Sequence, residues 1–201
     1  MIKKATALKF SPTYGTKRVV EKFVKYLVDM ETTIVDNTLP EQRVKLYEFD
    51  SDELVIEANP VYAGQIPQVQ GLWRNLRGQN TPCIILACYG NRHYDDTLAQ
   101  MQQLLEARGF VVIGAAAPII PHIFSSVLGA ERPDIKDEAE LHIFAAEVLR
   151  KLAWEEIESV DLPGDPNPEP KTPVAVPKSF VEENCVQCGR CADRCTVCAI
   201  D

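Results

Sequence analysis

The sequence has no apolar run that approaches the 18 or so residues of a membrane span. Its first ten residues, MIKKATALKF, hold lysines without the apolar segment of a secretion signal. Positive charge is also scarce, since 21 Lys and Arg stand against 29 Asp and Glu, a formal net charge of −8. An acidic surface repels the phosphate backbone of nucleic acids. We therefore expect a soluble, cytoplasmic protein that binds neither membrane nor nucleic acid.

Several motifs of common enzyme classes are missing as well. The sequence contains neither GxxxxGK[ST] nor GxGxxG, which argues against ATP and dinucleotides as ligands of a glycine-rich loop. It has three histidines, no HExxH motif and no Ser/His/Asp series, so hydrolysis has little support. Apolar residues make up 46% of the chain, which is enough for a sizeable core and excludes a disordered protein.

Strands and helices alternate through the first 158 residues. Apolar segments predict strands at roughly 3–10, 33–37, 53–59, 82–89 and 110–117, and one-sided apolar patterns predict helices near 19–27, 67–77, 94–108 and 141–152. The segments CIILAC and FVVIG are apolar without alternation, as expected when helices cover both faces of a parallel sheet. This order predicts a doubly wound α/β fold that binds its ligand beyond the carboxyl ends of the strands.

The loop FSPTYGT joins the first predicted strand to the first predicted helix. Ser11, Thr13 and Thr16 offer hydroxyl groups, and Gly15 allows a tight turn in front of the unpaired amides of a helix. Such a loop suits a phosphate group, and the cations KR that follow are unfavourable in a first helical turn unless an anion faces them. The alternative is that these residues only form a turn and cap the helix.

The segment FSPTYGTKRVVE resembles the phosphate loop of flavodoxins. In that family hydroxyl residues at the first, third and sixth positions hold the phosphate of FMN, and Ser11, Thr13 and Thr16 stand at those positions. One departure is that Tyr14 occupies the fourth position, where glycine is usual, and Gly15 follows it. The resemblance implies a five-stranded parallel sheet of order 2-1-3-4-5 and a non-covalently bound FMN.

Two further loops are similar to the flavin-ring loops of the same family, namely 59–67 (NPVYAGQIP) and 89–96 (YGNRHYDD). Tyrosines and glycines gather in these loops, and aromatic faces suit a flat ring. Alternatives stay open, because the tyrosines also suit strand ends and the paired aspartates also suit the start of a helix. The resemblance implies these cofactor contacts: Pro60, Val61, Tyr62, Ala63, Gly64, Tyr89, Gly90, Asn91, Tyr94, Asp95 and Asp96.

Five of the seven cysteines lie in the last seventeen residues. Cys185, Cys188, Cys191 and Cys195 have the spacing C-x₂-C-x₂-C-x₃-C of one half of a bacterial 4Fe–4S ferredoxin. Two such clusters need eight cysteines, so either a second half-motif belongs to a longer protein or Cys195 or Cys198 completes a single cluster. Zinc bound by four of the five is an alternative. The two remaining cysteines lie in a buried strand and carry no predicted function.

We interpret residues 1–158 as an FMN-binding flavodoxin-like domain, 159–179 as a proline-rich linker and 180–201 as the N-terminal half of a ferredoxin domain. The resemblance to such fusions, which occur chiefly in anaerobes, implies electron transfer between FMN and an iron–sulfur cluster or a redox partner with a basic docking surface. One alternative is an FMN-dependent NAD(P)H reductase of a quinone or small acceptor, and another is a zinc-stabilised interaction module. No catalytic residue is predicted.

Overall fold

The computed structural model describes residues 2–169 and 185–200. Its centre is a five-stranded parallel sheet with the strand order β2-β1-β4-β6-β7, which is the predicted order 2-1-3-4-5 with two short extra strands in the numbering. All five predicted strands are confirmed: β1 (Lys4–Lys9), β2 (Glu31–Asp36), β4 (Glu53–Pro60), β6 (Thr81–Cys88) and β7 (Phe110–Ala116).

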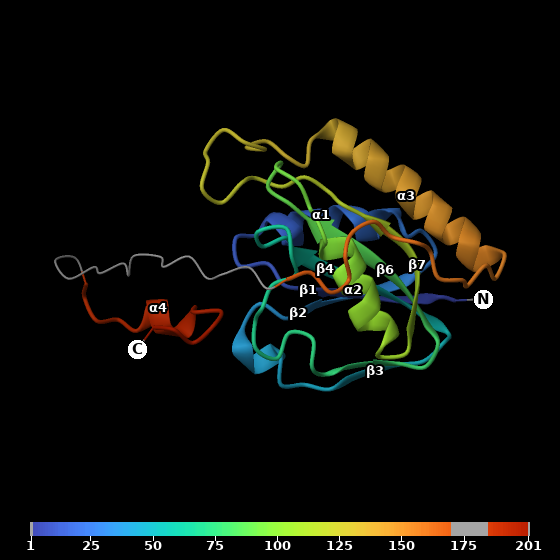
Figure 1. The fold of residues 1–201 in the computed structure, drawn as a ribbon, viewed down its shortest axis with the longest axis horizontal. Helices are drawn as coiled ribbons and strands as arrows, with labels where there is room; N and C mark the ends of the chain where they lie inside the picture. The colour runs from blue at the N-terminus through green and yellow to red at the C-terminus, as the bar shows by residue number, and fades with distance from the viewer. Residues whose placement is uncertain (1, 170–184, 201) are drawn as a thin grey trace.

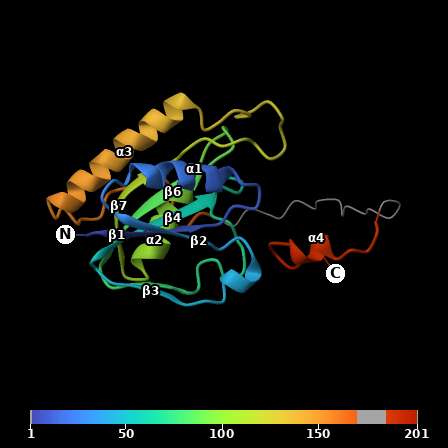
Figure 2. The ribbon, with the colours of Figure 1, turned by 180° about the vertical axis from the view of Figure 1, so that it is seen from behind.

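Helices cover both faces of this sheet (Figures 1 and 2). On one face lie α1 (Gly15–Phe23), continued by the 3₁₀ turn η1 (Val24–Tyr26), and α3 (Ile135–Ala153). On the other face lies α2 (Thr97–Glu106). Nearly every residue of the central strands β4 and β6 is buried, which explains why β6 is an almost continuous apolar run, whereas the edge strand β2 is mostly exposed.

Local sequence explains which face α1 buries and where α3 begins. In α1, Val19, Val20 and Phe23 are spaced along one face and are fully buried against the sheet. Helix α3 starts with a capping box, in which Asp134 accepts hydrogen bonds from the helix amides and the Asp137 carboxylate accepts one from the Asp134 N–H at 2.7 Å.

The helix predicted at 67–77 is wrong. Gly71 has a φ of +81°, outside the right-handed helical region, and the chain instead forms a buried loop that ends in β5 (Leu76–Gly78). Trp73 is held in this loop by its indole N–H, which donates to the Pro67 carbonyl at 3.2 Å. Strand β5 pairs in parallel with β3 (Tyr47–Phe49), which follows the 3₁₀ turn η2 (Pro40–Gln42). This small sheet covers the face beside α2.

After α3 the chain returns across the edge of the sheet, and we call residues 157–169 the strap. The Val160 N–H donates to the Val112 carbonyl on β7 at 2.9 Å, and Leu162 packs on the core beside α2. The strap then reaches the loops at the carboxyl edge of the sheet, where the Asp165 N–H donates to Asp96 and Gln65 donates to the Glu169 carbonyl at 3.1 Å. The rest of the predicted linker, residues 170–179, lies outside the described residues, which resume at residue 185.

The cysteine-rich segment contains one short helix, α4 (Arg190–Asp193). In residues 2–169 and 185–200, no helix is both long and apolar enough to cross a membrane.

Candidate functional site

Three loops meet at the carboxyl edge of the sheet, where doubly wound folds bind ligands. They follow β1, β4 and β6 and are tied to one another by backbone hydrogen bonds: Phe10 N–H donates to the Ala58 carbonyl at 3.1 Å, and Val61 N–H donates to the Cys88 carbonyl at 2.8 Å. The residues that the sequence singled out in separate stretches are therefore neighbours in space.

The loop after β1 leads into α1 through Tyr14, whose φ of 64° is left-handed. The Ser11 hydroxyl accepts a hydrogen bond from the Lys17 N–H at 2.9 Å and so caps the helix. The amides of Gly15 and Thr16 have no acceptor among the described residues, and they lie at the positive end of the helix. Two free donors at this point fit a phosphate.

The two threonines of this loop differ sharply in position. Thr13 is exposed, whereas Thr16 is 1% exposed and its hydroxyl is buried beside the Cys88 thiol without a hydrogen bond of good geometry. A buried hydroxyl without a partner costs free energy unless a further group enters the loop. Burial of Cys88 raises the pKa of its thiol to about 12, which leaves it uncharged beside Thr16.

The loop after β4 makes a tight turn at its tip. Tyr62 and Gln65 exchange backbone hydrogen bonds of 2.9 and 3.0 Å around Ala63 and Gly64, whose φ angles are +51° and +81°. The Asp95 carboxylate of the next loop lies against Gly64, and the Asp96 N–H donates to the Gly64 carbonyl at 3.0 Å. Gly64 thus joins the two loops that were predicted to edge the flavin ring.

Aromatic rings stand on either side of a hollow between these loops. Tyr62 is 43% exposed and meets Phe10 edge to face, with 6.5 Å between ring centroids, and Tyr89 meets Tyr94 in the same way at 5.8 Å. His93 stacks on Tyr94 at 4.7 Å. The described residues lining the hollow are Val61, Tyr62, Ala63, Gly64, Tyr89, Gly90, Arg92, His93, His122, Ile123 and Phe124. Its wide, mainly apolar walls suit a flat organic ring.

The paired aspartates take different positions. Asp96 is the N-cap residue of α2, but its side chain makes no cap bond and instead accepts the Asp165 N–H of the strap at 3.0 Å. Asp95 forms an ion pair with Arg92 and lies 3.1 Å from His93 Nδ1. Neither side chain lines the hollow, and the same is true of Pro60, Asn91 and Tyr94.

A fourth loop, after β7, supplies one wall of the hollow that sequence reasoning missed. It is joined to the site by backbone bonds, because Tyr89 N–H donates to the Pro118 carbonyl and Ile120 N–H donates to the Tyr89 carbonyl at 2.9 Å. His122 packs on Gly90 so closely that a β-carbon at residue 90 would lie 2.8 Å from His122 Cδ2. The sequence did contain one indication of this loop: it predicts a fifth parallel strand, whose carboxyl end must lie at the same edge of the sheet.

Beneath the loops, β4 carries a buried polar pair. The Asn59 amide donates to Glu57 Oε1 at 2.7 Å, while Glu57 Oε2 and Asn59 Oδ1 are buried without partners. Burial raises the pKa of Glu57 to about 8, so this side chain is mainly neutral at pH 7. Burial also raises the pKa of the Cys83 thiol on the neighbouring strand.

The cysteine-rich segment presents its thiols outwards. Cys185, Cys188, Cys191 and Cys198 are exposed, and Cys195 is partly exposed and accepts a hydrogen bond from the Ala199 N–H at 3.1 Å. Within the described residues, no three His, Cys, Asp or Glu side chains gather closely enough to hold a metal ion. The donor set nevertheless has the chemistry of an iron–sulfur site, since four thiolates with these short spacings suit a 4Fe–4S cluster.

The segment also contacts the domain. The guanidinium of Arg43, which is 5% exposed, donates to the Thr196 carbonyl at 2.5 Å and to the carbonyls of Thr38 and Gln70 at 2.8 and 3.0 Å. Val197 lies over the neighbouring loops, in a second hollow with Pro40, Val44 and Val69.

A parallel sheet of order 2-1-3-4-5, with helices on both faces and an aromatic-lined hollow at its carboxyl edge, defines a flavodoxin-like α/β fold. Solved structures agree. The chain is similar to Flavodoxin 2 from Bacillus cereus (12% identity, TM-score 0.52, 74% of this chain and 99% of that one). It is also similar to a flavodoxin from Streptococcus pneumoniae TIGR4 (13% identity, TM-score 0.51, 74% and 99%). No protein-family model matches the chain, and no curated protein matches it. At these identities the likeness establishes the fold.

Proposed function

We propose that this chain binds FMN non-covalently and serves as an electron carrier. The observation that carries the proposal is the arrangement at the carboxyl edge of the sheet, which holds both two free amides at the N-terminus of α1 and a hollow flanked by Tyr62 and Tyr89. One end offers hydrogen-bond donors to a phosphate, and the other offers aromatic walls to a ring. A phosphorylated flavin combines these two requirements.

At the phosphate end, the donors would be the amides of Gly15 and Thr16 and the buried Thr16 hydroxyl. The positive end of α1 adds a favourable field for a dianion. The Ser11 hydroxyl already accepts the Lys17 N–H, so we propose that Ser11 shapes the loop and leaves the phosphate to the other two amides. Thr13 is exposed, and we do not include its hydroxyl among the phosphate donors.

At the ring end, the turn at Ala63 and Gly64 brings backbone polar groups to the edge of the hollow. The Asp95 carboxylate behind Gly64 and the overall charge of −8 both oppose additional negative charge on a bound ring. Bound FMN supplies the redox chemistry, since it accepts and releases one or two electrons. The chain itself positions the ring, excludes water from one of its sides and sets the local field.

The cysteine-rich segment would supply the second redox centre. Cys185, Cys188, Cys191 and Cys195 are the proposed ligands of a 4Fe–4S cluster, and the Ala199 N–H directed at the Cys195 sulfur is the kind of contact that tunes cluster potentials. A cluster and a flavin in one chain form a short internal path for single electrons. A redox partner with a basic surface would complement the acidic domain.

The test is anaerobic purification followed by an absorption spectrum and assays of flavin, iron, sulfide and zinc on one sample. We expect FMN in a 1:1 complex, bound more tightly than riboflavin, and iron and sulfide on the cysteine-rich segment. A colourless protein with stoichiometric zinc would refute both halves of the proposal. Steady-state oxidation of NADPH by the FMN-loaded protein alone would replace the carrier by the reductase.

A further inference from the structure

The strand β4 carries two fully buried polar side chains, Glu57 and Asn59, directly before the loop that follows it. They are two residues apart, so both point to the face of the sheet that α2 covers. The Asn59 Nδ2 group donates to Glu57 Oε1 at 2.7 Å. The other oxygen of each side chain, Glu57 Oε2 and Asn59 Oδ1, is buried without a hydrogen-bond partner among the described residues. Buried polar atoms without a partner are rare, so two of them on a pair of touching side chains call for an explanation.

A single proton explains both oxygens. When Glu57 is ionised, Oε2 and Asn59 Oδ1 are both acceptors, so neither can satisfy the other. When Glu57 is protonated, its O–H becomes a donor for Asn59 Oδ1. The carboxyl group and the amide are then joined by two hydrogen bonds in place of one, and both oxygens are satisfied.

The strands beside β4 give Glu57 an apolar environment. The residues that they place on the same face near it are Leu8 and Phe10 of β1 and Cys83, Ile85 and Ala87 of β6. Burial raises the pKa of the Cys83 thiol, which is therefore uncharged. Lys9 of β1 points to the opposite face and forms an ion pair with Asp36.

The other elements on the α2 side of the sheet bring charged groups that are engaged elsewhere. Arg43 and Arg108 lie on this side, and their guanidinium groups donate to backbone carbonyls. Helix α2 itself carries one charged residue, Glu106, which is exposed at its C-terminal end. The tyrosines that pack on this side are Tyr47, Tyr62 and Tyr94.

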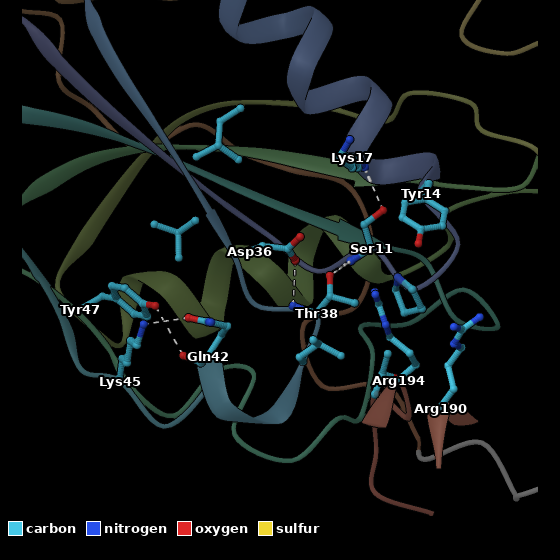
Figure 3. Close-up of a pocket in the computed structure, with 15 residues that line it drawn as sticks. Ser11, Tyr14, Lys17, Asp36, Thr38, Gln42, Lys45, Tyr47, Arg190 and Arg194 are labelled. Atoms are coloured by element: carbon cyan, nitrogen blue, oxygen red, sulfur yellow. Dashed lines mark hydrogen bonds between the residues drawn. The ribbon is translucent and has the colours of Figure 1, made fainter. Parts of the chain in front are cut away.

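Asp36 is a carboxyl group of the same protein in the opposite situation. It lies at the end of β2 in a surface hollow, where it forms an ion pair with Lys9 and accepts the Thr38 N–H at 3.0 Å (Figure 3). Partial burial opposes its charge, but these hydrogen bonds outweigh that effect and lower the pKa of Asp36. For Glu57 the balance is reversed, because burial raises its pKa to about 8 against the smaller effect of the Asn59 hydrogen bond.

We propose that Glu57 is protonated in the folded protein and, through a two-bond pair with Asn59, acts as the positioning residue for the loop after β4. Asn59 pairs with Ala87 in the register of the sheet. Val61, two residues further on, lines the aromatic-lined hollow, and its N–H donates to the Cys88 carbonyl at 2.8 Å. The pair therefore fixes the chain just before it enters the wall of the hollow. The inference goes beyond the proposed electron carrier, because the pair itself needs no flavin.

Loss of the proton should release this loop. The ionised carboxylate of Glu57 would then lie in an apolar environment beside an Asn59 oxygen that is also an acceptor, and a buried charge without a partner is strongly destabilising. Opening the end of β4 and its loop lets water reach the charge at a smaller cost than unfolding the whole domain. The aromatic-lined hollow is complete only while Glu57 holds its proton.

The first measurement is made on the full chain without flavin. An infrared difference spectrum between the parent and Glu57→Gln at about pH 6 should show the C=O band of a protonated carboxyl group, and the band should vanish from the parent at about pH 9.5. The backbone carbon-13 shifts of Val61 and Gly64 should titrate with this band in the parent. They should stay constant in Glu57→Gln, whose side-chain amide can make both hydrogen bonds to Asn59. The matched control is Glu48→Gln, at an exposed position on β3, which should leave the band in place.

The second measurement is riboflavin affinity, which reports on the aromatic-lined hollow and rests on the proposed function. If only the protonated form binds, affinity in the parent should fall roughly tenfold between about pH 6 and about pH 9, since the pKa of Glu57 is about 8. Glu57→Gln should remove this pH dependence. Glu57→Leu, which cannot hold Asn59, should weaken binding at both pH values, and Glu57→Gln remains decisive if the leucine variant does not fold.

The absence of a carboxyl band at about pH 6 would show that Glu57 is ionised and would overturn the proposal. A band without any accompanying change at Val61 and Gly64 would overturn the positioning role. The same pH dependence of riboflavin affinity in the parent and in Glu57→Gln would also overturn it. If neither riboflavin nor FMN binds at all, the proposed carrier fails, while the infrared and carbon-13 measurements still decide the role of Glu57.

Discussion

The Asp95 carboxylate rests on the α-carbon of Gly64, so that a β-carbon at residue 64 would come within 1.9 Å of Asp95 Oδ2. Gly64→Ala therefore forces this contact apart and also places a side chain at φ +81°. We expect a loss of about 1–3 kcal/mol in the free energy of unfolding. The two ring loops should separate, with weaker binding of both FMN and riboflavin, measured by flavin fluorescence.

Gly71→Ala is the matched control for this substitution. Gly71 has the same φ of +81°, but its nearest neighbour is Arg43 Cβ at 3.4 Å, an ordinary contact. Gly71→Ala should lower the free energy of unfolding only by the cost of a side chain at positive φ, and flavin affinity should stay unchanged. If both variants weaken flavin equally, the Gly64 contact does not position the ring loop.

Thr16→Val tests the phosphate end of the site. Valine keeps the shape of the side chain and removes a buried hydroxyl without a good partner, so the flavin-free protein should be as stable as the parent or more so. FMN binding should weaken by about 1.5–3 kcal/mol, the value of a hydrogen bond to a charged group, while riboflavin binding stays constant. Thr13→Val, at an exposed position, should change neither ligand's affinity. Equal losses for FMN and riboflavin would contradict the assignment.

Phe124→Ala tests the fourth loop as a wall of the ring hollow. Phe124 is 90% exposed, so truncation should leave unfolding unchanged. Loss of an aromatic contact to the ring should weaken FMN and riboflavin by the same factor, roughly three- to tenfold. Val127, 80% exposed in the same loop but outside the lining, provides the control Val127→Ala. Unchanged affinity in both variants would place the ring elsewhere.

Glu57→Gln should change how stability depends on pH. The folded pKa of Glu57, about 8, lies above its unfolded value near 4.5, so the folded state holds the proton longer. The parent protein therefore loses stability from this group as pH rises from about 4.5 to about 8, and keeps it below that window. Glutamine retains the acceptor for Asn59 and cannot ionise.

We expect equal unfolding free energies for the parent and Glu57→Gln near pH 4.5, and an advantage for the variant of about 2–4 kcal/mol at pH 8.5, from urea denaturation. Parallel pH curves for the two proteins would show that Glu57 does not titrate in this window.

Arg43→Met removes a buried donor group from four carbonyl partners. These are the carbonyls of Asn37, Thr38, Gln70 and Thr196, and the variant also loses the cation over the Phe10 ring. A loss of about 2–4 kcal/mol is expected in urea denaturation. Arg77→Met, at an exposed position, should cost less than about 0.5 kcal/mol, and a similar loss in both variants would count against the buried network.

The five strands were predictable because each contains apolar or β-branched residues between turn signals, although only β6 and β7 are largely apolar throughout. The helix prediction at 67–77 failed because Leu72, Trp73 and Leu76 have helical spacing, yet Leu72 and Trp73 are buried in a loop and Leu76 is buried at the start of β5. Gly71 was the local warning, since its positive φ breaks a helix. The spacing of apolar residues alone does not distinguish an amphipathic helix from a loop whose apolar side chains pack against a sheet.

The sequence predicted that the hydroxyl loop and the two tyrosine-rich loops lie at the carboxyl edge of the sheet, and the structure brings these three loops together there. The loop carrying His122 to Phe124 was missed because its apolar residues look like core, and only the sheet topology brings them to the hollow. The difference in burial between the two threonines was also not predictable, because nothing in the sequence distinguishes the buried Thr16 from the exposed Thr13. The thiols of the cysteine-rich segment face outwards and, within the described residues, do not converge on one point, so the 4Fe–4S cluster stays a prediction.

The strap shortens the stretch of chain between the domain and the cysteine-rich segment. Because Gln65 holds the chain at Glu169, beside the ring loop, Cys185 follows the last attachment to the domain by 16 residues and not by the 27 counted from residue 158. A fully extended chain of that length spans roughly 55 Å. A connection of this length keeps two joined groups at an effective concentration on the order of millimolar. In the proposed electron carrier, the rate of electron exchange between the flavin and the cluster would therefore not depend on protein concentration.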